Sequence, residues 1–261
     1  MERPFAAWFQ SATTYVSGNS RHKRTDWVQE FDTRTRSESP LTSQFSTYGP
    51  GQLLSLLGTG DRLIHFVDFL VYKNAENELG AVNDRLETIL ADAGSAWRVG
   101  QRLGNAGLER RVPEGVVEAA ENVMTTSGAA GVLLSEAWRA LFGQSPDYEE
   151  AYEKAIKAVE EAGVDAVCPN NRKATLGTMA RDMENQGDWY LPLGEDLKHP
   201  SASAPYMMVE ALWAGQESRH GGNGYRKPTQ EEAESAVLLA VPLVQWFTSG
   251  VLARRSGNPS S

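Results

Sequence analysis

The segment that most restricts the fold lies near the C-terminus, where the sequence carries the signals of a long helix. Thr229 and Glu232 have the spacing of a capping box, in which each side chain satisfies a backbone amide at the start of a helix. Pro242 predicts a bend, because proline removes a backbone donor and crowds the preceding turn. Apolar side chains follow at helical spacing at Ala236, Val237, Leu239, Ala240, Leu243, Val244 and Phe247. The chain is therefore predicted to end in a bent, buried helix.

The same helical spacing recurs along most of the chain. Ser145 and Pro146 form a suitable N-cap and first turn for one helix, and acidic residues follow near the positive end of its dipole. Its buried stripe consists of Tyr148, Ala151, Tyr152, Ala155, Ile156, Val159 and Ala162. Further helices are predicted over residues 5–16, 63–72, 82–90, 116–124, 129–142, 175–183 and 205–219. The predicted fold class is mainly α.

Two stretches depart from the helical pattern. Apolar residues alternate with polar ones at 97–99 and again at 108–112, with turn residues at 104–107, which predicts a small β-hairpin. Residues 17–51 are rich in Ser, Thr, Arg and Gly and poor in aliphatic side chains, so a long irregular segment is predicted there. The basic cluster at 21–24 within it is expected to be a solvated run.

These patterns divide the chain into four parts. Residues 1–51 are predicted to hold an N-terminal helix and the irregular segment, and residues 52–113 a helical region with the β-hairpin. Residues 114–255 are predicted to form a helical bundle, followed by a loose tail at 256–261. A chain of 261 residues can form one large domain or two modest ones, and two are favoured.

Charge and cysteine content restrict the environment. A net charge of −9 and a pI near 5.1 argue against broad, nonspecific nucleic-acid binding but leave room for a small basic patch. The single cysteine, Cys168, rules out an internal disulfide framework and is expected to be a packing residue. The apolar run at 237–247 is too short, and too interrupted by proline, to span a bilayer. A cytoplasmic protein without membrane contact is expected.

Ionisable side chains gather in the turn before the last helix. They are Arg219, His220, Arg226 and Lys227. A titratable ring and three cations thus adjoin the amide-rich start of a helix, where an anion is favoured, although cations before a glycine are also a common helix-termination signal. Asn223 and Tyr225 also have two interpretations, as a turn residue and a packing aromatic or as contacts to a phosphate and a base. Gln216 lies one helical turn before the histidine.

Five short segments occur in a fixed order along the chain. They are NDRLETILADAGSAWRV at 83–99, GLERRV at 107–112, AYEKAIKAVEEAG at 151–163, TLG at 175–177 and RHGG at 219–222. In this order they resemble proteins of the abortive-infection class, whose C-terminal part is a HEPN-like helical bundle. The resemblance covers two thirds of the chain and excludes the first fifty residues. It implies an intracellular, often dimeric protein of phage defence or of a toxin–antitoxin pair.

The resemblance also implies a chemistry for the turn. In catalytic HEPN domains an arginine lies about one helical turn before the histidine, and both face a groove that a dimer completes over RNA. The histidine moves protons while the ribose 2′-hydroxyl attacks the adjacent phosphate, and the arginine stabilises the developing charge without any metal or other cofactor. His220 and Gly221 match this pattern, but Gln216 stands where the arginine is expected.

The arginine nearest to the histidine is its neighbour, Arg219. Adjacent helical side chains point about 100° apart, so this pair shares a face only if the helix has ended, which the following glycines permit. Two functions therefore stay open. The chain is either a metal-independent endoribonuclease toxin that uses His220 and Arg219, or a noncatalytic HEPN-like module that dimerises or binds RNA or a partner. The implied partners are a second copy, RNA and an antitoxin or other defence-system protein.

Residues that would bind RNA or phosphate in either function lie in the same turn. They are Gln216, Asn223, Tyr225, Arg226 and Lys227. Each has a polar or aromatic side chain that suits a phosphate or base contact. No P-loop, Rossmann glycine pattern, nucleophile elbow or zinc-protease motif is present in the sequence, so no competing enzyme class is indicated.

Overall fold

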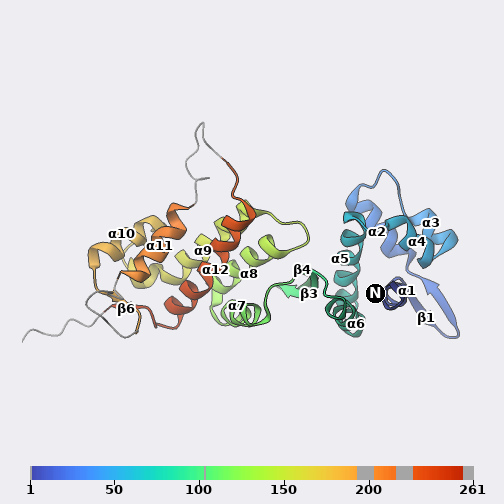
Figure 1. Ribbon diagram of the computed structural model, residues 1–261, viewed down its shortest axis with the longest axis horizontal. Coiled ribbons are helices and arrows are strands. Elements are labelled where there is room, and N and C mark those ends of the chain that lie inside the picture. Colours follow the sequence, from blue (N-terminus) through green and yellow to red (C-terminus); the bar gives the residue numbers. More distant parts are fainter. Residues whose placement is uncertain (1, 103, 193–202, 216–225, 255–261) are drawn as a thin grey trace, which may run out of the picture. The chain divides into compact units, whose positions relative to one another are not determined.

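The computed structural model describes residues 2–102, 104–192, 203–215 and 226–254. The chain divides into two compact units, of which the N-terminal unit contains residues 1–111 with 142–144 and the C-terminal unit contains residues 112–141 and 145–261. Twelve helices and six short strands form within the described residues (Figure 1), which confirms the mainly α class. None of the helices in these described parts combines the length and the apolar character that a membrane crossing requires.

Six helices and two antiparallel hairpins make up the described N-terminal unit. In chain order they are α1 (Glu2–Thr13), β1 (Thr14–Ser17), β2 (Ser20–Lys23), α2 (Thr25–Thr35), α3 (Thr42–Tyr48), α4 (Pro50–Leu57), α5 (Asp61–Glu76), α6 (Gly80–Asp92), β3 (Trp97–Arg102) and β4 (Asn105–Arg110). β1 pairs with β2, and β3 pairs with β4 (Figure 1). The second pair confirms the small hairpin predicted from the alternating pattern.

An aromatic core stabilises the N-terminal unit. The ring of Phe31 meets that of Phe66 edge-on, with centres 4.9 Å apart, and Phe9 approaches the same ring at 5.8 Å. Trp8 is fully buried, and its indole Nε1 donates a hydrogen bond to the carbonyl oxygen of Val82 at 2.8 Å. Because buried aromatic side chains contribute large apolar areas, α1 is an integral part of this core.

The prediction of an irregular segment over residues 17–51 is wrong. This stretch forms β2, α2, α3 and the start of α4. Trp27 and two other apolar side chains are buried on one side of α2, too few for the sequence pattern to indicate a helix. The carboxylate of Asp32 accepts hydrogen bonds from the backbone N–H groups of Leu41 and Thr42, both at 2.9 Å. Contacts between side chains and backbone therefore order a segment with the composition of a loop.

Six helices and one strand pair make up the described C-terminal unit. They are α7 (Glu114–Thr126), α8 (Gly128–Phe142), α9 (Tyr148–Val167), α10 (Leu176–Gln186), β5 (Trp189–Tyr190), α11 (Ala204–Ala214), α12 (Gln230–Thr248) and β6 (Ala253–Arg254). α9 packs along α12, and α10 packs against both α9 and α11 (Figure 1). Thr229 and Glu232 form the predicted capping box, and Pro242 lies inside α12 as predicted.

Several helix termini differ from their predicted positions, and two of them have a clear local cause. α1 ends at Thr13, before the predicted end of the first helix, because the chain turns directly into β1. α9 starts after an N-cap at Asp147 and not at Ser145. The Asp147 carboxylate accepts hydrogen bonds from the backbone N–H groups of Glu149 and Glu150, at 3.1 and 3.0 Å. Aspartate satisfies two amides at the helix start, which explains why the helix begins there.

Candidate functional site

The ionisable turn of the sequence analysis connects α11 to α12. Five of its predicted site residues lie outside the described residues: Gln216, Arg219, His220, Asn223 and Tyr225. Arg226 and Lys227 are described and come shortly before Thr229, the N-cap of α12. Among the ionisable side chains of this segment, Arg226 and Lys227 are the described ones.

Arg226 is paired with the capping box of α12. Its Nη1 donates to Glu232 Oε2 at 2.7 Å, and its Nη2 donates to Oε1 of the same carboxylate. Glu232 Oε2 also accepts the backbone N–H of Thr229 at 2.8 Å. The hydrogen bonds from Arg226, followed by the one from Thr229, lower the pKa of Glu232 to about 2. The guanidinium thus forms a bidentate pair with a carboxylate of its own chain.

Lys227 also faces a carboxylate. Its Nζ lies 3.7 Å from Oε2 of Glu149, in the first turn of α9. Nearby, the hydroxyl of Tyr148 donates to Oε1 of Gln230 at 3.3 Å. These exposed contacts contribute little stability individually, but they join the starts of α9 and α12. The two described cations, Arg226 and Lys227, contact different carboxylates. They do not converge on a single site where an anion could bind both.

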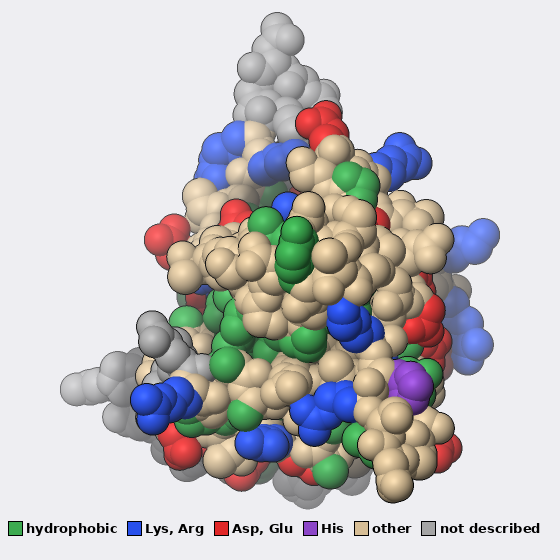
Figure 2. Space-filling model, turned by 90° about the vertical axis from the view of Figure 1, so that its right-hand side faces the viewer, with side chains coloured by type: hydrophobic (Ala, Val, Ile, Leu, Met, Phe, Trp, Pro, Cys, Tyr) green, Lys and Arg blue, Asp and Glu red, His purple; other side chains and the backbone are tan. Residues whose placement is uncertain are grey.

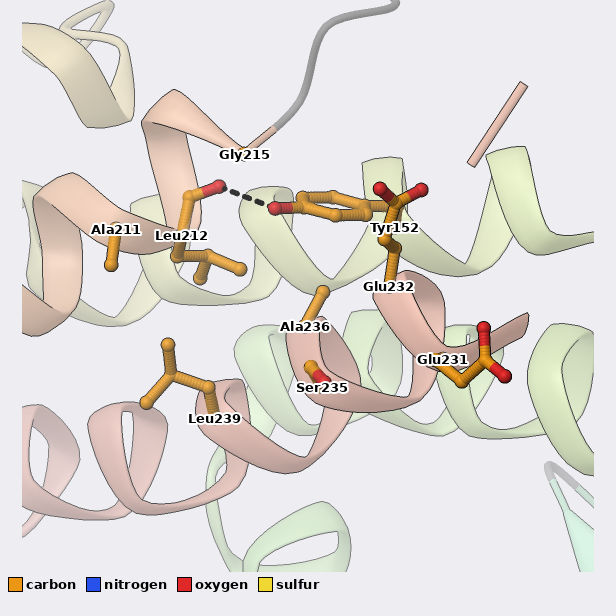
Figure 3. Close-up of a pocket in the computed structure, with 9 residues that line it drawn as sticks. All are labelled: Tyr152, Ala211, Leu212, Gly215, Glu231, Glu232, Ser235, Ala236 and Leu239. Carbon is orange, nitrogen blue, oxygen red and sulfur yellow. Dashed lines mark hydrogen bonds between the residues drawn. The ribbon is translucent and has the colours of Figure 1, made fainter. Parts of the chain in front are cut away.

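A hollow of about 370 Å³ lies beside this turn, and we name it the α11–α12 hollow (Figure 3). It is lined by Tyr152, Ala211, Leu212, Gly215, Glu231, Glu232, Ser235, Ala236 and Leu239. The residues come from α9, from the last turn of α11 with the glycine after it, and from the first half of α12.

One wall is fixed by a tyrosine and a glycine. The hydroxyl of Tyr152 donates to the carbonyl oxygen of Leu212 at 3.1 Å, a buried contact drawn in Figure 3. This bond satisfies a carbonyl at the end of α11, which lacks a partner within the helix. A Cβ atom on Gly215 would lie 2.4 Å from the same hydroxyl, so only glycine fits there without displacing the tyrosine. The end of α11 is thus held against α9.

The hollow is acidic on one side and apolar on the other. Glu231 and Glu232 lie in the first turn of α12, and Leu239 lies further along the same helix (Figure 3). The bidentate contact with Arg226 balances the charge of Glu232, whereas Glu231 is exposed. None of the described lining residues is Lys, Arg or His. A Lys or Arg side chain, with its cationic group near Glu231 and its aliphatic carbons against the apolar residues, therefore fits this hollow better than a phosphate does.

Cys168 supplies no reactive thiolate. Its side chain is buried, and its Sγ donates a hydrogen bond to Oδ2 of Asp182 at 3.2 Å. Burial, together with that carboxylate, raises the pKa of the thiol to about 11, so the thiol stays protonated at neutral pH. The environment agrees with the expected packing role. Among the described residues, no group of three His, Cys, Asp or Glu side chains has an arrangement that could hold a metal ion.

No local pattern in the sequence identifies the residues that shape the hollow. Tyr152 was placed in the buried stripe of α9, which the structure confirms, but its hydroxyl bond to α11 spans 60 positions of sequence and has no local signal. Ser235 and Glu231 look like ordinary polar positions of an amphipathic helix. Gly215 was the available clue, because glycine at the end of a helix indicates either a C-cap or a close approach.

Replacing Arg226 with Ala is expected to raise the pKa of Glu232 from about 2 toward the ordinary glutamate range. The pKa of Glu232 is lower in the folded protein than in the unfolded chain. The contact with Arg226 therefore stabilises the fold fully above the unfolded pKa, and this stabilisation is lost as the pH falls toward about 2. The variant should be less stable than the wild type at neutral pH, by up to about 1 kcal/mol, and equally stable in acid.

Carboxyl titration by NMR, with urea unfolding at neutral and acidic pH, checks this result. Arg226→Lys keeps the charge but cannot form the two parallel hydrogen bonds, so it should give an intermediate pKa. An unchanged pKa of Glu232 in Arg226→Ala would show that the guanidinium does not contact this carboxylate.

Comparisons of the chain with protein-family models, with curated proteins and with solved structures find no match.

Proposed function

We propose that the chain is a HEPN-like defence protein of the abortive-infection type, whose C-terminal unit acts by binding a partner protein. The ordered sequence segments from residue 83 to RHGG support the HEPN-like assignment. The packing of α9 with α12 and of α10 with α9 and α11 is compatible with such a bundle. The described residues form the α11–α12 hollow between α9, α11 and α12, and this hollow is where a partner would bind.

One observation favours partner binding over RNA cleavage: the charges around the hollow suit a cation. Arg226 and Lys227 face Glu232 and Glu149, and Glu231 adds an exposed carboxylate. A phosphodiester entering here would meet negative charge, whereas a Lys or Arg side chain of a partner would find a carboxylate and an apolar surface for its stem. An antitoxin or another defence-system protein that inserts such a side chain is the partner we propose, with the chain acting as a dimer.

A metal-independent endoribonuclease is the second candidate, and the RHGG sequence supports it. His220 belongs to the segment of sequence between α11 and α12 and matches the HG end of the catalytic pattern. In this function His220 moves the protons, and Arg219 stabilises charge on the phosphate. Dimerisation would bring two such segments together over RNA.

One experiment separates these functions: protection of a bacterial host against phage by the full-length chain and its variants. Ser235→Arg places a cation in the hollow beside Glu231 and should repel a cationic partner, which reduces protection by about tenfold or more. Gln245→Arg adds the same charge at an exposed position of the same helix, away from the hollow, and should leave protection unchanged. His220→Ala should also protect normally, and the purified protein should leave RNA intact.

The other outcomes decide against the proposal. Loss of protection in His220→Ala, with normal protection in Ser235→Arg and cleavage of RNA by the purified wild type, supports the endoribonuclease. Equal loss in Ser235→Arg and Gln245→Arg means that added charge, and not the hollow, is responsible. If the wild type neither protects against any phage nor slows growth, the defence function itself is wrong. Circular dichroism of each variant confirms that the fold is retained.

A further inference from the structure

The β1–β2 hairpin concentrates positive charge in an acidic protein. Residues 3–25 contain Arg3, Arg21, Lys23 and Arg24 but no Asp or Glu, although the whole chain carries a net charge of −9. Figure 2 shows Lys and Arg side chains, with a histidine near them, on one face of the N-terminal unit. A local basic surface on an acidic protein attracts polyanions without making the whole protein bind them indiscriminately.

The register of the hairpin determines which side chains lie together. Tyr15 is opposite His22, and Val16 is opposite Arg21, next to a turn that contains Gly18 with a φ of +58°. Directly opposed residues of an antiparallel pair project from the same face, so Tyr15 and His22 share one face and Arg21 lies on the other. Arg21 and His22 are exposed, and the ring of Tyr15 is 44% exposed.

Planar side chains form a continuous series on this hairpin, which we name the β1–β2 stack: Trp27, Arg24, Tyr15 and His22. The Cζ of Arg24 lies 4.2 Å from the ring centre of Trp27 and 5.4 Å from that of Tyr15. The rings of Tyr15 and His22 stack at 5.3 Å with an angle of 24° between their planes. The inner end, Trp27, is buried, and the outer end, His22, is exposed.

The cations beside the stack contact backbone and aromatic groups. Lys23 Nζ donates to the carbonyl oxygen of Ser46 at 2.6 Å, and a backbone carbonyl does not neutralise its charge. Within the described residues, no carboxylate pairs with Arg21, and the Nε of Arg24 is buried without a hydrogen-bond partner. The rings of Trp27 and Tyr15 contact the guanidinium of Arg24, and the charge of Asp26 also acts on it. The hairpin thus has an exposed planar surface on one face and positive charge, from Arg21 and Lys23, on the other.

We propose that the β1–β2 hairpin binds single-stranded nucleic acid that passes around its edge, with a base on the outer end of the β1–β2 stack and phosphates against Arg21 and Lys23 on the other face. Unpaired bases stack on aromatic and guanidinium planes, and the adjacent phosphates pair with Arg and Lys. A duplex conceals the faces of its bases and fits this surface less well. A lipid surface fits less well too, because Val16 is the one aliphatic side chain of the two strands and membrane binding needs a broad apolar face.

This proposal concerns the N-terminal unit and does not depend on the function proposed for the C-terminal unit. It replaces the expectation that residues 21–24 are merely a solvated run. The pairing of Tyr15 with His22 and the contact of Arg24 with Trp27 are the observations that change the interpretation. A charge cluster that is only solvated needs no ordered series of planar side chains.

Fluorescence anisotropy with a short, labelled single-stranded RNA and the full-length chain tests the proposal. Single-stranded RNA or DNA should bind more tightly than a duplex, with an affinity that falls between about 50 and 200 mM salt. The double variant Arg21→Ala/His22→Ala should weaken binding by about tenfold or more. Arg21→Lys should restore most of the affinity lost in Arg21→Ala, because it restores the charge.

The matched control is Arg85→Ala, which removes one exposed arginine from α6 of the same unit and should change the affinity by less than about twofold. An equal loss in Arg85→Ala and Arg21→Ala would assign the effect to overall charge and overturn the proposal. Absence of binding to single strands would also overturn it, as would equal binding of a duplex. Binding to vesicles of anionic phospholipid without binding to single strands would assign the hairpin to a membrane surface.

Discussion

Trp8→Ala is expected to destabilise the N-terminal unit by about 3–5 kcal/mol. Trp8 is fully buried, and its removal leaves a large cavity between α1 and its neighbours. It also removes the hydrogen bond from Nε1 to the Val82 carbonyl, which links α1 to α6. Urea unfolding gives the size of the effect. Hydrogen–deuterium exchange assigns it to a unit, because peptides from residues 1–111 should lose protection while those from α9 and α12 keep it.

Trp8→Phe is the matched control. It keeps an aromatic ring in the core but has no Nε1, so it should cost less than Trp8→Ala. A loss below about 1 kcal/mol in Trp8→Ala would mean that this side chain is not part of a packed core. Loss of protection throughout both units would mean that they unfold as one body and not as two.

Trp8→Ala also links stability to nucleic-acid binding. β1 follows α1 directly, and the backbone N–H of Arg24 donates to the carbonyl oxygen of Thr13 at the end of α1. The hairpin therefore depends on α1 for its position. At a urea concentration that unfolds only the N-terminal unit of the variant, binding of single-stranded RNA should be lost. The structure of the C-terminal unit should persist.

The helices of the C-terminal unit were largely predictable because their signals are local. The capping box of α12 and the buried stripe of α9 each lie within one helix, so residue order alone identifies them. The N-terminal unit was less predictable. α2 buries only three apolar side chains, and Asp32 joins its end to the start of α3 through contacts that have no periodic pattern. Tertiary contacts override weak local preferences in such a segment.

The candidate sites were also predictable only where their signals are local in the sequence. The cations before α12 are visible in the sequence as a cluster, and Arg226 pairs with Glu232 only six positions away, but the pairing of Lys227 with Glu149 depends on how α9 and α12 pack. In the β1–β2 stack, Tyr15 meets His22 only through the hairpin register, and Arg24 contacts Trp27 only because α2 begins beside the strand. The sequence therefore shows where charged side chains are concentrated. The strand register and the helix packing determine which groups they contact and hence what they can bind.

Gly131→Ala is expected to destabilise the C-terminal unit by about 3 kcal/mol, although alanine is the better helix former. A Cβ atom at this position of α8 would lie 2.3 Å from the carbonyl oxygen of Met124 and 3.2 Å from that of Val123, both in α7. A backbone oxygen cannot rotate away as a side chain can, so α7 and α8 must separate. Urea unfolding with hydrogen–deuterium exchange should show the loss in the C-terminal unit.

Gly115→Ala is the control for Gly131→Ala and should raise the free energy of unfolding instead of lowering it. It lies in the first turn of α7 with nothing within 4 Å of a Cβ atom, so alanine there should stabilise by up to about 1 kcal/mol. Stabilisation by Gly131→Ala as well would show that α7 and α8 do not approach this closely. If Gly131→Ala destabilises as expected, single-stranded RNA binding should survive it and phage protection should not, because the two proposed sites lie in different units.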